Sequence, residues 1–279
     1  MKTFQVIFGG ARLRWIAGAL VVVNGFFPAL WILLTSLKAE PELVQKPITY
    51  LPAVPTLTNY VHAFTDQPLL LFLFNSFVVS LCSTVLAVLI SAGAAYAIAR
   101  LELRWRGLIL SAIIASSMFP LVTLLVPIFQ IMRGLGLLNT YAALILPYTV
   151  LSLPVCTLVL VSFFQAIPRD LESAAMLDGC TRVGALCRIV LPLSGPGVFT
   201  AAILAFVNAW DEFLLALSLN SAPGFRTLPV GITLYQGEYA FPWPLISAAL
   251  VVAIVPVAVL MAVFQKRVIG GLTAGGLKG

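Results

Sequence analysis

Two adjacent carboxylates stand inside an apolar stretch of this 279-residue chain, where ionisable side chains are scarce. Asp211 and Glu212 lie in the run Gly197–Leu219, and Asn208 precedes them by three and four residues. At helical spacing Asn208 shares a face with one or both carboxylates. Because burying acidic groups is costly, such residues usually face a cavity or a partner. The three side chains could bind hydroxyl groups along a polar pathway, or they could only join neighbouring helices.

Few residues of the chain could support catalysis, metal binding or phosphate binding. The chain has one histidine, His62, and four cysteines without the paired spacing of a zinc site. No G-x-x-x-x-G-K-[ST] segment is present to bind phosphates. An intramembrane aspartyl protease needs two carboxylates that share a proton, and adjacent residues on a helix do not face each other. We therefore expect no catalytic residue and no metal site in this chain.

The composition indicates a membrane protein. The chain is 61% hydrophobic and 9% charged, with a mean hydropathy of +1.07, whereas soluble domains have roughly 45–50% apolar and about 25% charged residues. These values exclude a soluble enzyme, a disordered tail and a nucleic-acid-binding domain. The expected surroundings of most of the chain are a lipid bilayer.

Six apolar runs are long enough to cross a bilayer, which takes about 20 residues. They are Trp15–Leu37, Leu69–Ala99, Gly107–Met132, Tyr141–Phe164, Gly197–Leu219 and Leu245–Gln265. We expect an all-α, polytopic membrane protein with six transmembrane helices, the first of them an uncleaved signal anchor. Pro120 and Pro127 predict a kink in the third run.

The basic residues orient these runs. If the N-terminus is cytoplasmic, twelve of the sixteen Lys and Arg residues fall in cytoplasmic segments. The positive-inside rule therefore places both termini in the cytoplasm. The net charge of +6 then reflects topology and not binding to nucleic acid.

Two expected outer loops are rich in aromatic residues. Lys38–Pro68 carries Tyr50 and Tyr60, and Asn220–Pro244 carries Tyr235. Aromatic residues near a membrane boundary commonly form an interfacial belt. The alternative is a surface on which a partner protein docks, and composition leaves both open.

The longest expected cytoplasmic segment, Gln165–Pro196, has the signals of two short helices. Pro168 suits the start of the first helix, where Asp170 lies near the positive end of the helix dipole. Gly179 suits its end, and Thr181 can cap the second helix. Two helices at the membrane face could fit the groove of another protein, or could pack on their own bundle.

This segment resembles the "EAA" loop of the permeases of ABC importers. That pattern has E-A-A, three residues, then Gly, followed by I-x-L-P. The matching residues are Ala174, Ala175, Gly179, Ile189, Leu191 and Pro192. Ser173 stands where the motif has its glutamate, and Glu172 precedes it.

Other stretches resemble the sugar-transporting branch of that family, which includes the smaller permease of the maltose importer. They are Asn75-Ser76, Leu135–Thr140, Asn208–Phe213 and Gly271–Gly279. The resemblance implies a type I ABC importer permease fold and a subunit of a sugar importer, its substrate an oligosaccharide, in the bacterial inner membrane. It implies three parts: residues 1–68 with the signal anchor and outer loop, the permease core 69–265, and a cytoplasmic tail 266–279.

The resemblance also implies partners. The 165–196 loop would dock on an ATPase subunit through Leu171, Glu172, Ser173, Ala174, Ala175, Asp178, Gly179 and Cys180. Two ATP-binding subunits would hold ATP and Mg, a second homologous permease would complete the pathway, and an extracytoplasmic sugar-binding protein would deliver the solute. This chain would bind no cofactor and hydrolyse nothing.

Two other transport functions remain open on the sequence. A permease of the same family could carry another solute, such as glycerol phosphate, although no cationic side chain lies deep in the runs. A secondary transporter could use Asp211 or Glu212 as a proton relay and need no ATPase.

Overall fold

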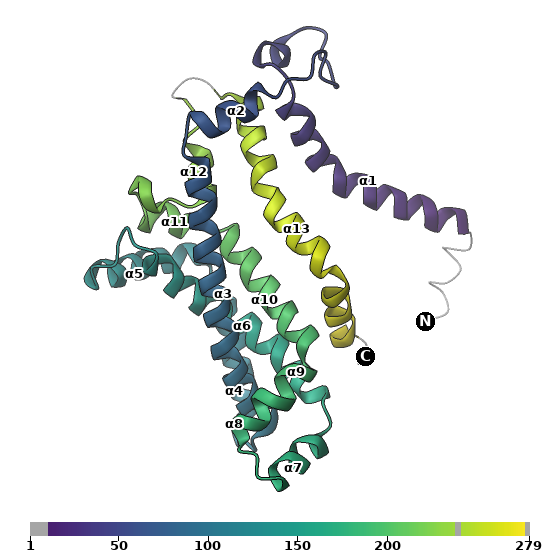
Figure 1. Ribbon diagram of the computed structural model, residues 1–279, viewed down its shortest axis with the longest axis vertical. Helices are drawn as coiled ribbons and strands as arrows, with labels where there is room; N and C mark the ends of the chain where they lie inside the picture. The colour runs from purple at the N-terminus through teal and green to yellow at the C-terminus, as the bar shows by residue number, and fades with distance from the viewer. Residues whose placement is uncertain (1–10, 238–240, 277–279) are drawn as a thin grey trace. The chain divides into compact units, whose positions relative to one another are not determined.

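The computed structural model describes residues 11–237 and 241–276, and in those ranges every regular element is a helix (Figure 1). The chain forms two compact units, one from the described parts of residues 1–69 and 232–255, the other from residues 70–231 and the described part of 256–279. The all-α prediction is confirmed over the described residues.

The first unit contains α1 (Ala11–Ser36), the short η1 (Glu40–Val44) and α2 (Thr58–Thr65). The helices of residues 70–231 are α3 (Leu69–Arg100), α4 (Arg106–Ser117), α5 (Leu121–Gly134), α6 (Ala142–Ala166), α7 (Arg169–Leu177), α8 (Arg182–Ala185), η2 (Leu186–Val190), α9 (Leu191–Leu193), α10 (Gly195–Trp210), α11 (Leu214–Leu219), η3 (Pro223–Phe225) and α12 (Leu228–Thr233). The last helix, α13 (Trp243–Gly276), contributes to both units, and residues 277–279 of the predicted tail lie outside the described residues.

Small side chains let the central helices of the second unit approach closely. Ala92 and Ala95 of α3, Cys156 of α6 and Ala201 of α10 belong to one buried cluster. Small residues are favoured where membrane helices meet, because backbones can then come near each other. The core therefore holds α3, α6 and α10 as the frame to which the shorter helices attach.

Within residues 11–237 and 241–276, four helices are long and apolar enough to cross a membrane: α1, α3 and α6, and α13 over Trp243–Phe264. They match the first, second, fourth and sixth predicted runs to within three residues at each end. The count reaches six only if each of two bent helix pairs forms one span. Six crossings therefore stay a prediction.

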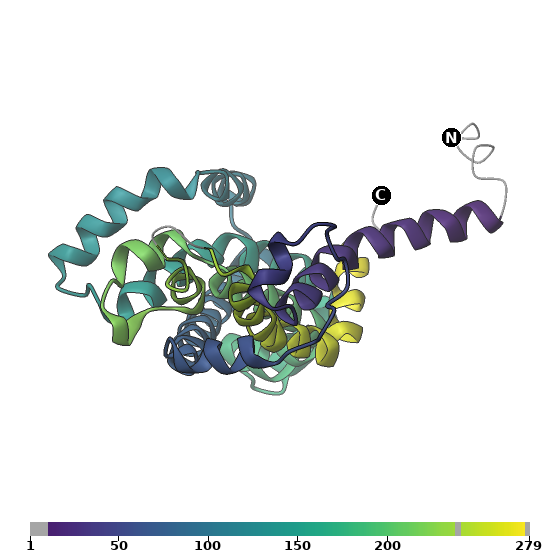
Figure 2. The same ribbon diagram turned by 90° about the horizontal axis from the view of Figure 1, so that it is seen from above.

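The third predicted run is not one helix. Helices α4 and α5 meet at an angle of 91°, and Figure 2 shows α4 nearly end-on with α5 lying across it. Pro120, at the start of α5, has extended backbone angles (φ −62°, ψ 129°). Proline lacks an N–H donor and disfavours helix in the residue before it. The predicted kink is present at Pro120, whereas Pro127 lies inside α5.

The fifth predicted run is also broken. Helix α10 ends at Trp210 and α11 begins at Leu214, so Asp211 and Glu212 lie at the break and not inside a helix. The expectation that both carboxylates lie within one continuous helix is wrong. A separate bend of 83°, between the Arg182–Leu193 segment and α10, lies just before this run.

The loop that follows α1 in the first unit is held by polar contacts around Glu42. Its carboxylate accepts hydrogen bonds from Thr49 Oγ1 (2.8 Å) and from the Ala53 N–H (2.9 Å). The buried Lys38 ammonium donates to the Thr49 carbonyl and lies 5.6 Å from the centre of the Trp31 ring. The predicted loop Lys38–Pro68 is therefore an ordered structure built on the end of α1.

Candidate functional site

Helix α7 has the boundaries that the sequence predicts. It starts directly after Pro168 and ends before Gly179, whose φ of +87° is costly for any residue with a side chain. The Gly179 N–H donates to the Met176 carbonyl (3.1 Å) and the Cys180 N–H donates to the Ala175 carbonyl (2.9 Å). These two bonds are the Schellman arrangement that closes a helix. Gly179 therefore fixes the turn between α7 and α8.

The second helix of the segment begins at the predicted cap. Thr181 Oγ1 accepts a hydrogen bond from the Gly184 N–H (3.1 Å). The helix continues through a π-helical turn, Leu186–Val190, and ends just after Pro192. A proline leaves one carbonyl of the preceding turn without its usual donor, and a π turn is one way to accommodate that. The prediction of a Thr181 cap is confirmed.

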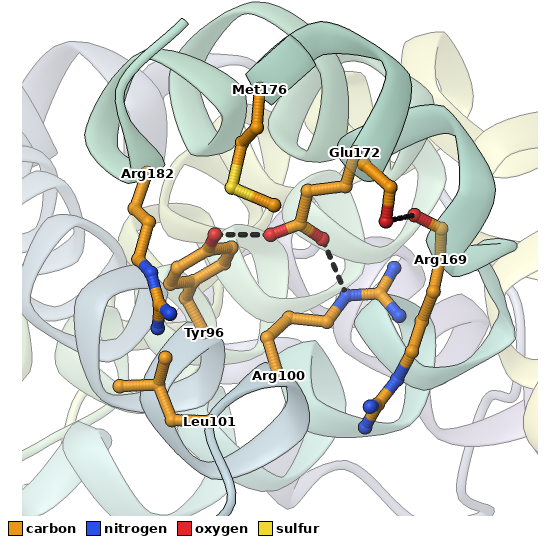
Figure 3. A pocket seen from close by; sticks show the side chains of 8 residues that line it. Tyr96, Arg100, Leu101, Arg169, Glu172, Met176 and Arg182 are labelled. Carbon is orange, nitrogen blue, oxygen red and sulfur yellow. Dashed lines mark hydrogen bonds and ion pairs between the residues drawn. The ribbon is translucent and has the colours of Figure 1, made fainter.

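Glu172 points from α7 into the protein. Only 6% of it is exposed. Figure 3 shows its carboxylate between Tyr96, whose hydroxyl donates to Oε1, and Arg100, whose Nε lies 3.1 Å from Oε2. Arg100 also donates from Nη2 to the carbonyl of Ile167 (2.9 Å), just before α7. The contacts join α7 to the end of α3.

Of the other predicted docking residues, two are half-buried and the rest are exposed. Ala175 and Cys180 are half-buried. The exposed residues are Leu171, Ser173, Ala174, Asp178 and Gly179. Leu177, which the sequence reasoning did not select, is 89% exposed beside them. Leu171, Met176 and Val183 are also exposed apolar side chains of α7 and α8.

A cavity of about 380 Å³, with both polar and apolar walls, lies next to the break between α10 and α11. It is lined by Ser117, Leu121, Tyr148, Leu151, Ser152, Asn208, Ala209 and Glu212. Asn208 and Glu212 therefore share a cavity, as their spacing predicts. Asp211 is exposed and does not line it.

Glu212 organises this break. Its carboxylate accepts hydrogen bonds from the Tyr148 hydroxyl (2.5 Å), the Leu215 N–H (2.8 Å) and the Ala216 N–H (3.1 Å). The last two are first-turn donors of α11, which have no partner within that helix. Interrupted backbone at membrane depth is tolerated where it is satisfied by protein or lines a cavity. Glu212 both caps the first turn of α11 and lines the cavity.

Residues from the stretches that resemble the sugar-transporting branch hold the loop that follows α11 by hydrogen bonds. Asn75 of α3 donates from Nδ2 to the carbonyls of Gly224 (3.0 Å) and Arg226 (2.9 Å), and its Oδ1 accepts from the Tyr141 hydroxyl (2.7 Å). Asn139, in the stretch before α6, accepts from the Ala222 N–H at 2.7 Å. These asparagines position the first part of the Asn220–Pro244 loop.

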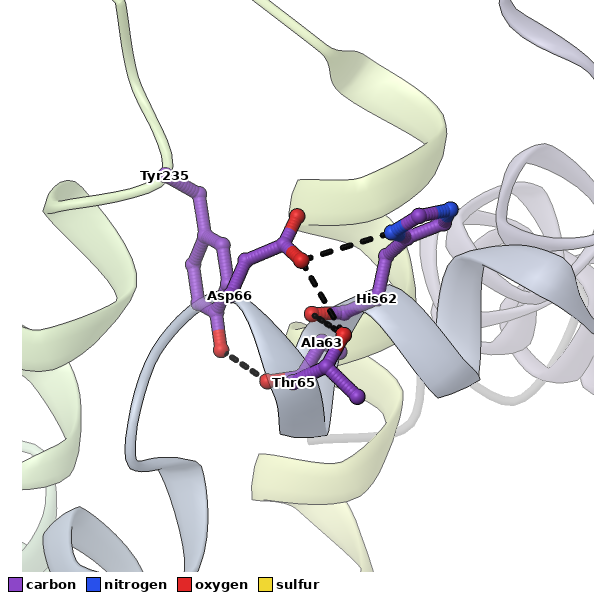
Figure 4. A network of polar contacts seen from close by, with 5 residues as sticks. All are labelled: His62, Ala63, Thr65, Asp66 and Tyr235. Carbon is purple, nitrogen blue, oxygen red and sulfur yellow. Dashed lines mark hydrogen bonds and ion pairs between the residues drawn. The ribbon is translucent and has the colours of Figure 1, made fainter.

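A later part of that loop contacts α2 within the first unit. The buried Tyr235 hydroxyl donates to the carbonyl of Ala63, and a His62 Nδ1–Asp66 Oδ1 pair lies beside it at 3.3 Å (Figure 4). Burial, followed by the negative charge of Asp66, raises the pKa of Tyr235 to about 12. The hydroxyl therefore stays a hydrogen-bond donor at all physiological pH values.

Comparison with known proteins decides the family. Residues 87–270 match the family described as "Binding-protein-dependent transport system inner membrane component". The chain belongs to this family. The matched residues include the whole α7–α9 segment and the cavity beside α10, so the predicted resemblance to ABC importer permeases is confirmed.

Several curated permeases are similar to the chain over nearly its full length. The sulfoquinovosyl glycerol transport system permease of Agrobacterium fabrum is 72% identical and covers 98% of this chain and 95% of its own. The trehalose/maltose permease of Thermococcus litoralis is 39% identical (96% and 97%), and the trehalose permease of Mycobacterium tuberculosis is 41% identical (93% and 95%). Family membership thus extends to the sugar-transporting branch that the sequence indicated.

A solved structure shares the fold. The crystal structure of a bacterial ABC transporter that imports alginate aligns with a TM-score of 0.80 at 20% identity, covering 94% of this chain and 96% of that chain. At this identity the likeness establishes the fold alone. The chain therefore has the ABC importer permease fold.

The sequence reasoning missed three partners of the permease's acidic residues. Tyr96 and Arg100 lie four residues apart at the end of an apolar run, and this spacing places them on one helical face. Tyr148 lies inside another apolar run. Tyr96 and Arg100 were detectable as a polar pair at a membrane boundary, but nothing in the sequence indicates which carboxylate each tyrosine meets.

Proposed function

We propose that the chain is one of two permease subunits in an ATP-driven, binding-protein-dependent importer of a glycoside. The observation that carries this proposal is the 72% identity, over 98% of the chain, to a sulfoquinovosyl glycerol permease. An identity this high supports a substrate of the same chemical class, a sugar joined to glycerol. Membership of a binding-protein-dependent family also favours this function over a proton-coupled secondary transporter.

The α7–α8 surface is proposed to dock on an ATP-binding subunit. Its exposed residues Leu171, Leu177 and Val183 offer apolar contact area on two short helices. Two such subunits would hold ATP and Mg, because this chain has no phosphate-binding glycine motif. The exposed members of the predicted docking set would touch the ATPase, whereas Glu172 faces inward.

The cavity beside Glu212 is proposed to form part of the sugar pathway. Hydroxyl, amide and carboxylate groups line it, and these can exchange hydrogen bonds with sugar hydroxyls. Asn208 and Glu212 would contact the solute there, with Asp211 exposed beside them. No cationic side chain is among the lining residues. The basic side chains that pair with a negatively charged group of the solute would therefore belong to the second permease or to the binding protein.

The proposed placement is a multi-pass protein of the bacterial inner membrane with both termini cytoplasmic. Residues 69–265 would be the permease core, preceded by the signal anchor and outer loop 1–68 and followed by the tail 266–279. The basic residues support this orientation. The sugar-binding protein would dock on the outer side, at the Asn220–Pro244 loop.

Purification of the tagged chain in mild detergent tests the assembly. We expect an ATP-binding subunit and a second permease to co-purify with the wild type. Gly179→Asp should lose the ATP-binding subunit alone, because a residue with a side chain strains the +87° φ and opens the turn that shapes the surface. A wild-type chain that purifies alone and transports without ATP would contradict the proposal and leave Asp211 or Glu212 as proton carriers.

Uptake by proteoliposomes containing the whole complex tests the substrate. With the binding protein outside and ATP inside, we expect uptake of sulfoquinovosyl glycerol and less uptake of trehalose or maltose. Glycerol phosphate serves as the competing solute. Uptake of glycerol phosphate alone would assign the chain to that other branch of transport.

A further inference from the structure

We propose that Glu172, Tyr96 and Arg100 form a buried link that transmits movement of α7 to α3, so that Glu172 is a positioning residue and not an ATPase contact. This inference rests on the proposed function, since it concerns how ATP hydrolysis in a partner would open the permease. Tyr96 and Arg100 belong to α3, and Glu172 belongs to α7. Tyr96 and Glu172 are 76 positions apart in the sequence.

The burial of the link separates it from the docking surface. The side chains of Arg100 and Glu172 are 5% and 8% exposed, and Tyr96 is 7% exposed. Their neighbour Ser173 is exposed, and its hydroxyl donates to the Arg169 carbonyl of its own helix (3.2 Å). Ser173 is therefore open to a partner subunit, whereas the Glu172 carboxylate is largely covered by Tyr96 and Arg100 at the wall of a small pocket of about 140 Å³.

The link holds α7 at two points. The Glu172 carboxylate binds Tyr96 and Arg100 in the first turn of α7, and the Arg100 guanidinium binds the Ile167 carbonyl just before the helix. Figure 3 shows the carboxylate lying directly between the two side chains of α3. A helix held at its start on two successive turns of α3 cannot shift along the membrane without moving α3.

The charges make the link hard to break. A buried carboxylate and guanidinium are each costly without the other, so separating them would leave two unpaired buried charges. The link therefore favours joint movement of α7 and α3 over sliding between them. The small side chains of α3 that pack on α6, such as Ala92 and Ala95, would carry that movement into the core.

The test compares Glu172→Gln with Asp170→Asn in the complete complex. Both changes remove one negative charge from the first turn of α7, but Asp170 is exposed and Glu172 is buried. The readouts are co-purification of the ATP-binding subunit, ATP hydrolysis, and sulfoquinovosyl glycerol transported per ATP hydrolysed. A general loss of folding would lower the amount of complex without changing that ratio.

We expect Glu172→Gln to retain the ATP-binding subunit and its hydrolysis, while transport per ATP falls about tenfold, within the usual range of coupling energies. Asp170→Asn should keep the wild-type ratio. Unchanged coupling in Glu172→Gln would overturn the proposal. Loss of the ATP-binding subunit, as expected for Gly179→Asp, would also overturn it, because Glu172 would then be a docking contact.

A double variant, Glu172→Gln with Arg100→Gln, tests the pair directly. Because both charges are removed, we expect transport per ATP to be no lower than in either single variant. Effects that multiply would show that the residues act separately, contrary to the proposal. The double variant also decides the question if the single variant fails to fold. If no ATP-binding subunit co-purifies with the wild-type chain, the proposed function itself is contradicted. That result is distinguishable from the outcomes expected for the Glu172 and Arg100 variants.

Discussion

At the scale of single residues, only one of the two adjacent acidic side chains in the fifth apolar run has a structural role, and their positions in the sequence do not show which. Asp211 and Glu212 are adjacent and chemically alike, yet only Glu212 lines the cavity and bonds to Tyr148. Which of two neighbours turns inward depends on where α10 ends, and hydropathy does not report that. The residue types were identifiable from sequence, whereas their partners required the fold.

Glu212→Gln should destabilise the protein more than Asp211→Asn. In the glutamine variant, one carboxylate oxygen becomes an NH₂ group, which cannot accept from Tyr148 or from the Leu215 or Ala216 N–H groups. Because Glu212 is partly buried, the loss of bonds to its charged carboxylate should cost about 1–2 kcal/mol. Thermal unfolding in detergent measures the difference. Equal unfolding temperatures for the two variants would refute the capping role of Glu212.

Glu42 should make the loop that follows α1 sensitive to acid. Hydrogen bonds from the Ala53 N–H and then from Thr49 lower the pKa of Glu42, against the opposing effect of its burial. A lowered pKa means that its contribution to stability is full above the ordinary value near 4.5 and is lost as the pH falls through the folded-state pKa. We therefore expect the loop to loosen in acid below about pH 4.5.

Hydrogen exchange of the peptide containing Ala53, corrected for intrinsic rates, measures that loosening. Glu42→Gln should exchange faster at neutral pH and show no further change in acid. Glu40→Gln alters an exposed carboxylate two residues earlier and serves as the matched control. An acid response that persists in Glu42→Gln would assign the effect to another group.

At the scale of elements, composition predicted where helices form but not where they turn. The four long helices follow the long apolar runs, because a helix in a bilayer satisfies its backbone hydrogen bonds within its own segment. The break at Asp211–Phe213 was missed because apolar residues continue on both sides of Asp211 and Glu212. The contacts that satisfy it include a hydrogen bond to Glu212 from Tyr148, 64 residues away. Similarly, α7 and α8 were predictable because their caps are local, whereas the attachment of α7 to α3 depends on distant residues.

Helix α10 should separate from α6 when Gly197 is replaced by alanine. A Cβ atom at Gly197 would lie 2.3 Å from Phe163 Cγ and 2.9 Å from Phe163 Cβ. Because Phe163 Cβ is itself too close, rotating the ring cannot relieve the clash, and overpacking of this kind costs about 1–3 kcal/mol. Gly195→Ala, two residues earlier in α10 with nothing within 4 Å, is the control. Unfolding temperatures should fall only for Gly197→Ala.

At the scale of the whole molecule, the bent α4–α5 pair determines how many times the chain crosses the bilayer. The pair contains 12 and 14 residues, or about 18 and 21 Å at 1.5 Å per residue. Neither helix alone reaches across a hydrocarbon core of about 30 Å, and a 91° bend directs part of their length sideways. The pair could cross once or return to the side from which it started.

The distribution of basic residues predicts that the pair crosses. If it returned, α6 would run in the opposite direction, and the arginines of α7 and α8 would lie outside, against the positive-inside rule. Single cysteines introduced into a cysteine-free chain can decide this with a membrane-impermeant maleimide. Suitable positions are the exposed residues Val54, Trp105, Leu135 and Leu177.

With six crossings, reagent applied outside should label cysteines at Val54 and Leu135, and those at Trp105 and Leu177 should react only after the membrane is opened. A re-entrant pair would place Leu135 on the same side as Trp105, and Leu177 on the opposite side. Labelling of Leu177→Cys from outside would therefore remove the α7 surface from the reach of any cytoplasmic ATPase. That single result would refute both the topology and the energy coupling that depends on it.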